Sequence, residues 1–510
     1  MLYLALIYHM HQPYYKNLLT QEIEAPWVRL HGIKDYLDMV EILSKYPELK
    51  LTFNLVPSLL EQIKDYTENN LEDKYLKLSY KPTEALTYDE KNFILENFFQ
   101  INKDRVISLF PRYYELYLKK QAHQEFNLPD YLDLVVWFNL AWFDPDFRCE
   151  IPPLRRLVQK ARFFSEEEKL MVLEKQKQIL KEIIPSYKKF SQSGQIELTT
   201  SPFYHPILPL LYNTKIAKEA NPKVVLPSIN FSYPQDLKAQ LDLAVQFHKS
   251  HFGNKPEGLW PSEEAVSEHI LPFIIQAGIN WIVTDEAILF KSLKKKKRDT
   301  QLLYQPHLLR RKEGTLNIVF RDRNLSDLIS FVYYNWPAEV AVGDFLKHLE
   351  NIYQAFREKD VLVVVALDGE NAWEYYPNDG HDFLQLLYQR LLEAKFLKTT
   401  TISEYLKINP AQNEIERLSS GSWIYANFNK WIGSNQKNKA WEKLAKVRKE
   451  LENPQSEILN PDLVYKQMYI LEGSDWFWWY DEGNLEFDRL FQMHLANLSE
   501  LSGCRNKLTY

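Results

Sequence analysis

The chain has 510 residues, of which 45% are apolar and 25% charged, a composition typical of a globular protein that excludes a disordered or collagen-like chain. Its 62 basic and 68 acidic side chains leave a net charge of −6, so no overall basic surface favours nucleic acid. Aromatic residues reach 14%, whereas only 14 glycines occur, which excludes a repetitive glycine-rich fold.

The chain begins with an apolar stretch, residues 1–8, that has neither a basic flank nor a cleavage site. It is far shorter than the ~20 residues that a membrane-spanning helix needs, so we interpret it as a buried strand and expect no membrane partner. Only two cysteines occur, Cys149 and Cys504, which make no disulfide framework. We therefore expect a cytoplasmic protein.

Short apolar runs, each followed by polar or turn residues, recur along the first 400 residues. They lie at residues 4–8, 51–55, 195–199, 258–260, 281–284, 316–320 and 361–367. Long helical stretches separate them, a pattern that favours a parallel sheet or barrel. About seven such runs predict an α/β fold in which residues 1–400 form a barrel, incomplete or irregular in its closure.

Two regions show helical patterns without a convincing strand. Residues from about 60 to 190 predict a helical insertion between early strands, because a structureless connection of that length would be improbable. Ser165, followed by three glutamates, is a plausible N-cap within it. Residues 401–510 are again helical in pattern and predict a C-terminal helical domain.

Polar residues gather where the predicted strands end, which in a barrel is the face that carries the chemistry. His9 and His11 share one face of the first strand and suit a core pair, a metal site or substrate binding. Glu197 lies inside an apolar strand, where a carboxylate needs a partner or a solvated cavity. Asp368 and Glu370 follow the most apolar strand and indicate a site, although a simple turn would also account for them.

A second acidic segment follows the short strand that carries Trp260. Glu263 and Glu264 come directly after Ser262, and the start of a helix alone would explain both. Glu263 and Asp368 would nevertheless form the carboxylate pair that glycoside hydrolysis needs. No Ser-His-Asp spacing, P-loop or dinucleotide motif competes. A metal-dependent hydrolase built on His9, His11 and Asp368 is the alternative.

Five segments in order make the chain resemble glycoside hydrolase family 57, especially its α-amylase and amylopullulanase branch. They are residues 11–15, 194–206, 260–263, 367–371 and 472–478. Residues 27–31, 139–144, 321–327 and 421–433 are similar to the same branch. Each motif is short, but five of them in the family's order, spread over nearly the whole chain, are specific.

The resemblance implies a retaining mechanism on α-glucans within an incomplete (β/α)7 catalytic barrel, at α-1,4 links and, as a second option, α-1,6 links. It would bring residues of the fifth segment to the substrate, so the C-terminal domain would close over the barrel. Glu263 would match the nucleophile that forms a covalent glycosyl-enzyme, and Asp368 the general acid, with Glu264 kept as the lesser alternative to Glu263. The residues that would bind substrate are His11, Gln12, Tyr14, Glu197, His205, Trp260, Glu370, Asn371, Trp373, Asp475 and Trp476. The expected partner is an α-glucan or maltooligosaccharide, with no cofactor and no metal.

Two further functions stay open at this point. A 4-α-glucanotransferase or a glycogen branching enzyme would use the same residues, because transfer and hydrolysis differ only in the acceptor. A protein that binds glucans without cleaving them is the other option, and the intact carboxylate pair argues against it.

Overall fold

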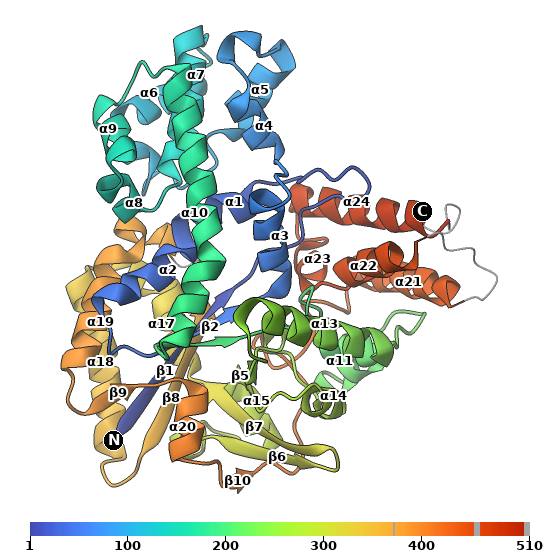
Figure 1. Ribbon diagram of the computed structural model, residues 1–510. Helices are drawn as coiled ribbons and strands as arrows, with labels where there is room; N and C mark the ends of the chain where they lie inside the picture. Colours follow the sequence, from blue (N-terminus) through green and yellow to red (C-terminus); the bar gives the residue numbers. More distant parts are fainter. Residues whose placement is uncertain (371–372, 453–459, 504–510) are drawn as a thin grey trace.

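Two five-stranded sheets form the centre of the protein in a computed structural model, which describes residues 1–370, 373–452 and 460–503 (Figure 1). Helices surround the sheets, and a long helix, α10, rises from them into a separate group of helices. The fold is therefore mixed α/β with parallel strands, as the sequence predicts.

The first sheet is parallel throughout and has the order β3-β2-β1-β8, with β9 pairing the start of β1. Strands β1 and β8 run in register from Leu2 beside Val361 to His9 beside Asp368. Both are buried almost throughout, which is why they appear as continuous apolar runs in the sequence. The strands are β1 (Leu2–Met10), β2 (Leu51–Leu55), β3 (Ile196–Thr199), β8 (Val361–Asp368) and β9 (Leu397–Thr399).

The second sheet has the order β10-β6-β7-β5-β4 and contains one antiparallel pair, β6 with β7. Its other pairs are parallel. The sequence prediction lacks β6, β9 and β10, three strands at the margins of the sheets. The strands are β4 (Gly258–Leu259), β5 (Trp281–Asp285), β6 (His307–Arg311), β7 (Gly314–Arg321) and β10 (Asn413–Glu414).

The two sheets meet at both sides without a continuous ladder. On one side a single parallel bridge joins Thr200, just after β3, to Leu259 of β4. On the other side the backbone N–H of Asp322 donates to the Val364 carbonyl of β8 at 2.7 Å. Because no strand pairing joins β7 to β8 within the described residues, the barrel is not closed, and a count of seven barrel strands is not established.

Helices fill the region in which the sequence predicts an insertion. Ser165 caps α10 as expected: its hydroxyl accepts from the N–H of Glu168 at 3.3 Å, and the Glu168 carboxylate accepts from the N–H of Ser165 at 2.7 Å. The helices are α3 (Pro57–Thr67), α4 (Lys74–Tyr80), α5 (Tyr88–Asn97), α6 (Pro111–Gln121), α7 (Leu128–Ala141), α8 (Pro145–Glu150), α9 (Pro152–Lys160) and α10 (Glu166–Gln192).

The helices that accompany the strands are shorter and more numerous. They are α1 (Trp27–His31), α2 (Asp38–Glu41), α11 (Leu208–Tyr212), α12 (Ala217–Ala220), α13 (Pro234–Phe252), α14 (Leu271–Gln276), α15 (Glu286–Ser292), α16 (Thr300–Leu303), α17 (Arg323–Phe331), α18 (Ala338–Ala355) and α19 (His381–Glu393). The C-terminal helices are α20 (Ile402–Ile408), α21 (Asn435–Leu451), α22 (Pro461–Leu471), α23 (Ser474–Trp479) and α24 (Leu485–Leu501). Among the described residues, no helix combines the length and apolarity that crossing a bilayer requires.

Candidate functional site

The carboxyl ends of the parallel strands meet at one edge and present polar side chains there. His9, near the end of β1, lies 2.7 Å from the side-chain oxygen of Asn54 in β2 through its Nδ1 atom. The ring of Trp260, which follows β4, stacks on His9 with the ring centroids 4.8 Å apart. Strand ends from both sheets therefore contribute to one site, as the sequence predicts.

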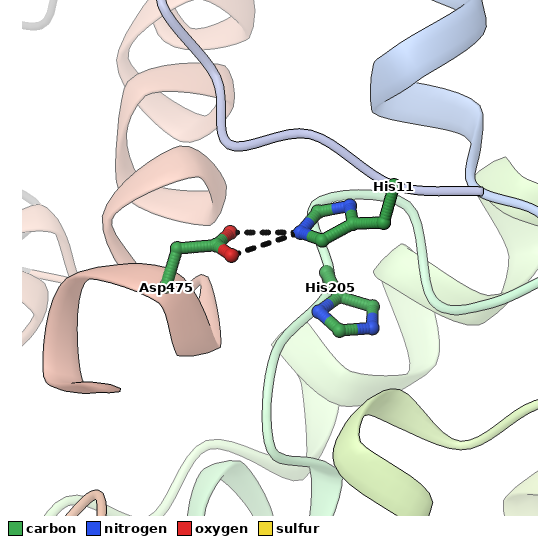
Figure 2. Close-up of side chains that lie close together, drawn as sticks. All are labelled: His11, His205 and Asp475. Atoms are coloured by element: carbon green, nitrogen blue, oxygen red, sulfur yellow. Dashed lines mark hydrogen bonds and ion pairs between the residues drawn. The ribbon is translucent and has the colours of Figure 1, made fainter. Parts of the chain in front are cut away.

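A pair of stacked histidines joins this edge to the C-terminal helices (Figure 2). The rings of His11 and His205 lie 4.0 Å apart, and His11 Nε2 is 2.9 and 3.0 Å from the two carboxylate oxygens of Asp475 in α23. His205 Nδ1 is 3.0 Å from the hydroxyl of Ser474. The first, second and fifth predicted motifs thus meet, although more than 460 residues separate His11 from Asp475.

Glu263 is held by two donors from the C-terminal region. The indole N–H of Trp423 donates to Glu263 Oε2 at 2.9 Å, and the Ser474 hydroxyl donates to Oε1 at 3.1 Å. Burial raises the pKa of Glu263 to about 7; the Trp423 hydrogen bond opposes this rise, and the charges of Asp475 and Asp368 add to it.

The backbone at Glu263 is strained. Glu263 and Glu264 both have left-handed φ angles, 57° and 51°, which residues other than glycine seldom adopt. Each such residue costs on the order of 1–3 kcal/mol and persists where the surroundings enforce it, which is common at functional sites. The expected helix start is instead a short turn with a kink.

The second glutamate of this turn faces different neighbours. Glu264 is buried, with Oε1 3.5 Å from Arg321 Nε, and the Thr284 hydroxyl donates to its backbone carbonyl at 2.7 Å. Arg321 also binds Asp285 Oδ2 at 3.1 Å. Burial raises the pKa of Glu264, and the guanidinium of Arg321 opposes this rise. Glu264 thus belongs to a buried ion cluster, whereas Glu263 belongs to the histidine site.

Two carboxylates follow β8 at the same edge. Asp368 is exposed at the end of the strand, beside His9, and its charge adds to the raised pKa of both Glu263 and Glu370. Glu370 is buried and accepts from the His11 backbone N–H and the Tyr36 hydroxyl, both at 3.0 Å. It therefore fixes the loop that carries His11. Asn371 lies outside the described residues.

Four of the residues that the sequence predicts to bind substrate are buried in the core next to the site. Gln12 is buried and accepts from the Tyr15 hydroxyl at 3.0 Å. Tyr14 is buried and contacts the C-terminal helix α24, where His494 Nε2 lies 2.9 Å from its carbonyl oxygen. Trp373 and Trp476 are each 1% exposed, and their indole N–H groups donate to backbone carbonyls. These four side chains are core residues around the site.

Glu197 is not brought to this edge. Its carboxylate accepts from the indole N–H of Trp281 at 2.9 Å and from the backbone N–H of Ser403 at 3.0 Å. Trp281 is the first residue of β5, so these bonds lie at the amino ends of the strands, opposite the site. Glu197 thus has the partner that its burial demands, but it does not join the residues around Glu263.

Within the described part of the chain, two groups of side chains offer ligand atoms close enough for a metal ion. In His11, His205 and Asp475, and likewise in Asp38, Asp144 and His381, the atoms lie within 4.8 Å of one another. An ion lies in the plane of each imidazole that binds it, but the planes of His11 and His205 are stacked at 28° rather than convergent. The first group therefore fits a hydrogen-bonded cluster better than a metal centre, and it does not contain the predicted His9 and Asp368.

The comparison with known sequences decides the family. The sequence model that describes glycosyl hydrolase family 57 matches residues 5–419. The chain belongs to this family. A curated relative, alpha-amylase 1 of Dictyoglomus thermophilum, is 27% identical over 109 residues, which are 21% of this chain and 13% of that protein. The alignment thus spans only a small part of that relative's length.

Solved structures share the family 57 fold over nearly the whole chain. A branching enzyme from Pyrococcus horikoshii is 17% identical, with a TM-score of 0.61, 98% of this chain and 88% of that chain covered. An α-amylase from Thermotoga maritima is 14% identical, with a TM-score of 0.63, and the match covers 100% of this chain and 94% of that chain. A 4-alpha-glucanotransferase from Thermococcus litoralis is 15% identical, with a TM-score of 0.55, and the match covers 98% of this chain and 60% of that chain.

The sequence prediction lacks two residues that contact Glu263 in this family 57 chain. Ser474 stands inside the fifth motif, next to the predicted Asp475. Trp423 lies between β10 and α21, in a segment without strand or helix signal, and only the similarity of residues 421–433 to the family pointed to it. Both come from the C-terminal region, whose contact with the barrel has no local signal in the sequence.

Proposed function

We propose that the chain is a retaining glycoside hydrolase that acts on α-glucans in the manner of an α-amylase or amylopullulanase, cleaving α-1,4 links, with α-1,6 links as a second option. Glu263 is the nucleophile and Asp368 the general acid. The catalytic part is an incomplete (β/α)7-type barrel, residues 1–400, with its helical insertion, and residues 401–510 form a helical domain over its mouth. The hydrogen-bonded Glu263 carboxylate at the strand ends, beside Asp368, carries this proposal.

The contacts of Glu263 suit a nucleophile. Trp423 and Ser474 each hold one carboxylate oxygen, which orients the group for attack on an anomeric carbon. Asp368 protonates the leaving glycosidic oxygen and then takes a proton from the water that releases the sugar. In this mechanism Glu263 is ionised and Asp368 protonated when the substrate binds.

The neighbouring groups suit sugar hydroxyls. His11 and Asp475 are mostly buried, with side chains 12% and 13% exposed, and His205 is buried, so a bound glucose unit would exchange hydrogen bonds with them largely shielded from water. Trp423 stacks on Trp478 with the ring centroids 5.8 Å apart, which gives a flat apolar surface beside Glu263. Flat rings of this kind pack well against the apolar faces of pyranoses.

Amide variants test the assignment. Glu263→Gln and Asp368→Asn are each expected to lower kcat/KM on maltooligosaccharides by about 10³-fold or more, because each removes one of the two reacting carboxyl groups. Glu264→Gln is the matched control and should retain far more activity, since Glu264 faces Arg321. Full activity in either of the first two variants would contradict the proposal. NMR of the first products of the unmodified enzyme provides a second test, and initial release of β-anomers would also contradict the proposal.

A transferase is the second candidate, because two of the structural neighbours are described as a branching enzyme and a 4-alpha-glucanotransferase. Such an enzyme would use Glu263 and Asp368 in the same way and pass the glycosyl group to another glucan. Reducing ends released from amylose and the distribution of chain lengths separate the two. Redistribution without new reducing ends would favour the transferase.

A further inference from the structure

A cavity of about 560 Å³ lies where three distant parts of the chain meet. Its walls come from the loop after β1, from α4 and α5 of the helical insertion, and from the start of α24. In Figure 1, α4 and α5 stand above α24, and the loop passes between them. Its volume lies within the range of ordinary small-molecule sites.

The walls combine flat rings with uncharged polar groups. Phe93 is half-buried at the cavity, and the ring of Tyr75 packs against it edge-on at 5.2 Å. The Tyr75 hydroxyl donates to Gln100 Oε1 at 2.9 Å, and Asn97 lies beside them. Rings and amides together suit a neutral ligand that carries both apolar faces and hydroxyl groups.

The charges of the cavity argue against an anionic ligand. Three acidic and three basic residues line it, and each basic residue has a partner. Lys77 binds Glu22 at 2.9 Å, and Arg489 binds Glu24 at 2.8 Å. The third, Lys74, lies over the ring of Phe93 at 3.9 Å. A phosphate would have to compete with the carboxylates for Lys77 and Arg489, whereas a neutral sugar would leave both ion pairs in place and displace only the Lys74 ammonium from the ring of Phe93.

The cavity adjoins the histidine site. The segment after β1 carries both His11 of the site and Glu22, Ile23 and Glu24 of the cavity wall. Trp476, the residue after Asp475, has its ring centroid 6.3 Å from that of Phe487, the residue after Glu486 in the cavity wall. A chain held at Glu263 could therefore extend toward the cavity.

We propose that this cavity binds glucose units of an α-glucan chain that lie beyond the bond being cleaved. The inference rests on the proposed action on α-glucans. On this proposal the helical insertion and α24 together hold long glucan chains. The enzyme should therefore prefer long substrates over short ones. Phe93 supplies the flat surface on which a glucose unit packs.

Two variants at Phe93 test this. Phe93→Ala removes the side-chain surface, and Phe93→Leu keeps an apolar side chain without a flat ring. In both, the ratio of kcat/KM for maltoheptaose to that for maltotriose should fall by about fivefold, the size expected when one ring contact is lost. Tyr88→Ala is the matched control, because Tyr88 lies on the same helix, is 79% exposed and does not line the cavity. Thermal unfolding establishes that each variant is folded.

Direct binding separates failure of this inference from failure of the proposed function. Maltoheptaose is titrated calorimetrically into Glu263→Gln and into the double variant that also carries Phe93→Ala. Weaker binding in the double variant supports the cavity even if the unmodified enzyme cleaves no α-glucan. Equal binding, together with an unchanged substrate ratio in both Phe93 variants, would overturn the inference even if the enzyme is fully active.

Discussion

At the scale of single residues, two adjacent glutamates have different chemical surroundings. Glu263 is held by neutral donors, the indole of Trp423 and the hydroxyl of Ser474, whereas Glu264 faces the guanidinium of Arg321. Both residues have left-handed backbone angles, and their carboxylates contact different neighbours. The choice between them, which sequence similarity alone leaves open, thus has a physical basis in the contacts of each carboxylate.

The pKa of Glu263, about 7, predicts the acid side of the pH profile. A nucleophilic carboxylate must be ionised, so activity should fall as the pH drops through about 7, whereas a general acid at this position would lose activity as the pH rises. Trp423→Phe removes the donor that opposes the raised pKa, so the acid limb of kcat/KM should move to higher pH and activity at pH 6 should fall.

Trp431→Phe is the matched control for this change. Trp431 also contacts Trp478, but its buried indole N–H has no hydrogen-bond partner among the described residues, so the acid limb of the pH profile should stay in place. If the acid limb of kcat/KM lies at the same pH in Trp423→Phe and in the unmodified enzyme, or if activity rises below pH 7, the proposed role of Glu263 is contradicted.

At the scale of secondary-structure elements, Glu197 connects three of them. From β3 it accepts hydrogen bonds from the start of β5 and the start of α20. Glu197→Gln replaces one acceptor oxygen by a donor, so a buried N–H loses its partner, which costs about 1–3 kcal/mol of stability. Because these bonds lie at the end of the strands opposite Glu263, kcat/KM below the unfolding temperature should be unchanged. A large drop in kcat/KM with no change in thermal stability would instead indicate substrate contact.

The elements that the sequence predicts best are those whose burial is uniform. Strands such as β1 and β8 are buried on both faces and are therefore continuous apolar runs. The strands that the prediction lacks, β9 and β10, have only three and two residues, and β6 ends in exposed or half-buried arginines, so no run marks them. Likewise, the barrel half of the site follows from strand ends, whereas the contact of Trp423 with Glu263 depends on packing between distant segments.

At the scale of the whole molecule, the site is complete only when the C-terminal helices lie against the barrel. Trp423, Ser474 and Asp475 reach Glu263 and His11 from this region. Strand-like contacts reinforce the arrangement, because Pro206 pairs with Gly473 and Val266 with Gly421. The proposed active site therefore depends on bonds between the helices around the sheets and the C-terminal helices as well as on its own carboxylates.

The buried ion pair between Asp236 of α13 and Arg448 of α21 is the clearest such bond. Arg448 donates to both carboxylate oxygens, at 2.6 and 2.9 Å, and the two side chains are 1% and 3% exposed.

Asp236→Asn leaves the guanidinium buried without its full partner, which costs about 3–5 kcal/mol. We expect a lower unfolding temperature and loss of activity at the same temperature, because α21 stacks on α23 through Trp441 and Phe477 and so helps to hold Ser474 and Asp475 in place. Asp242→Asn on the same helix breaks only an exposed pair with Lys238 and should cost less than about 1 kcal/mol. Equal unfolding temperatures in the two variants, measured by circular dichroism, would show that the pair does not hold the C-terminal helices in place.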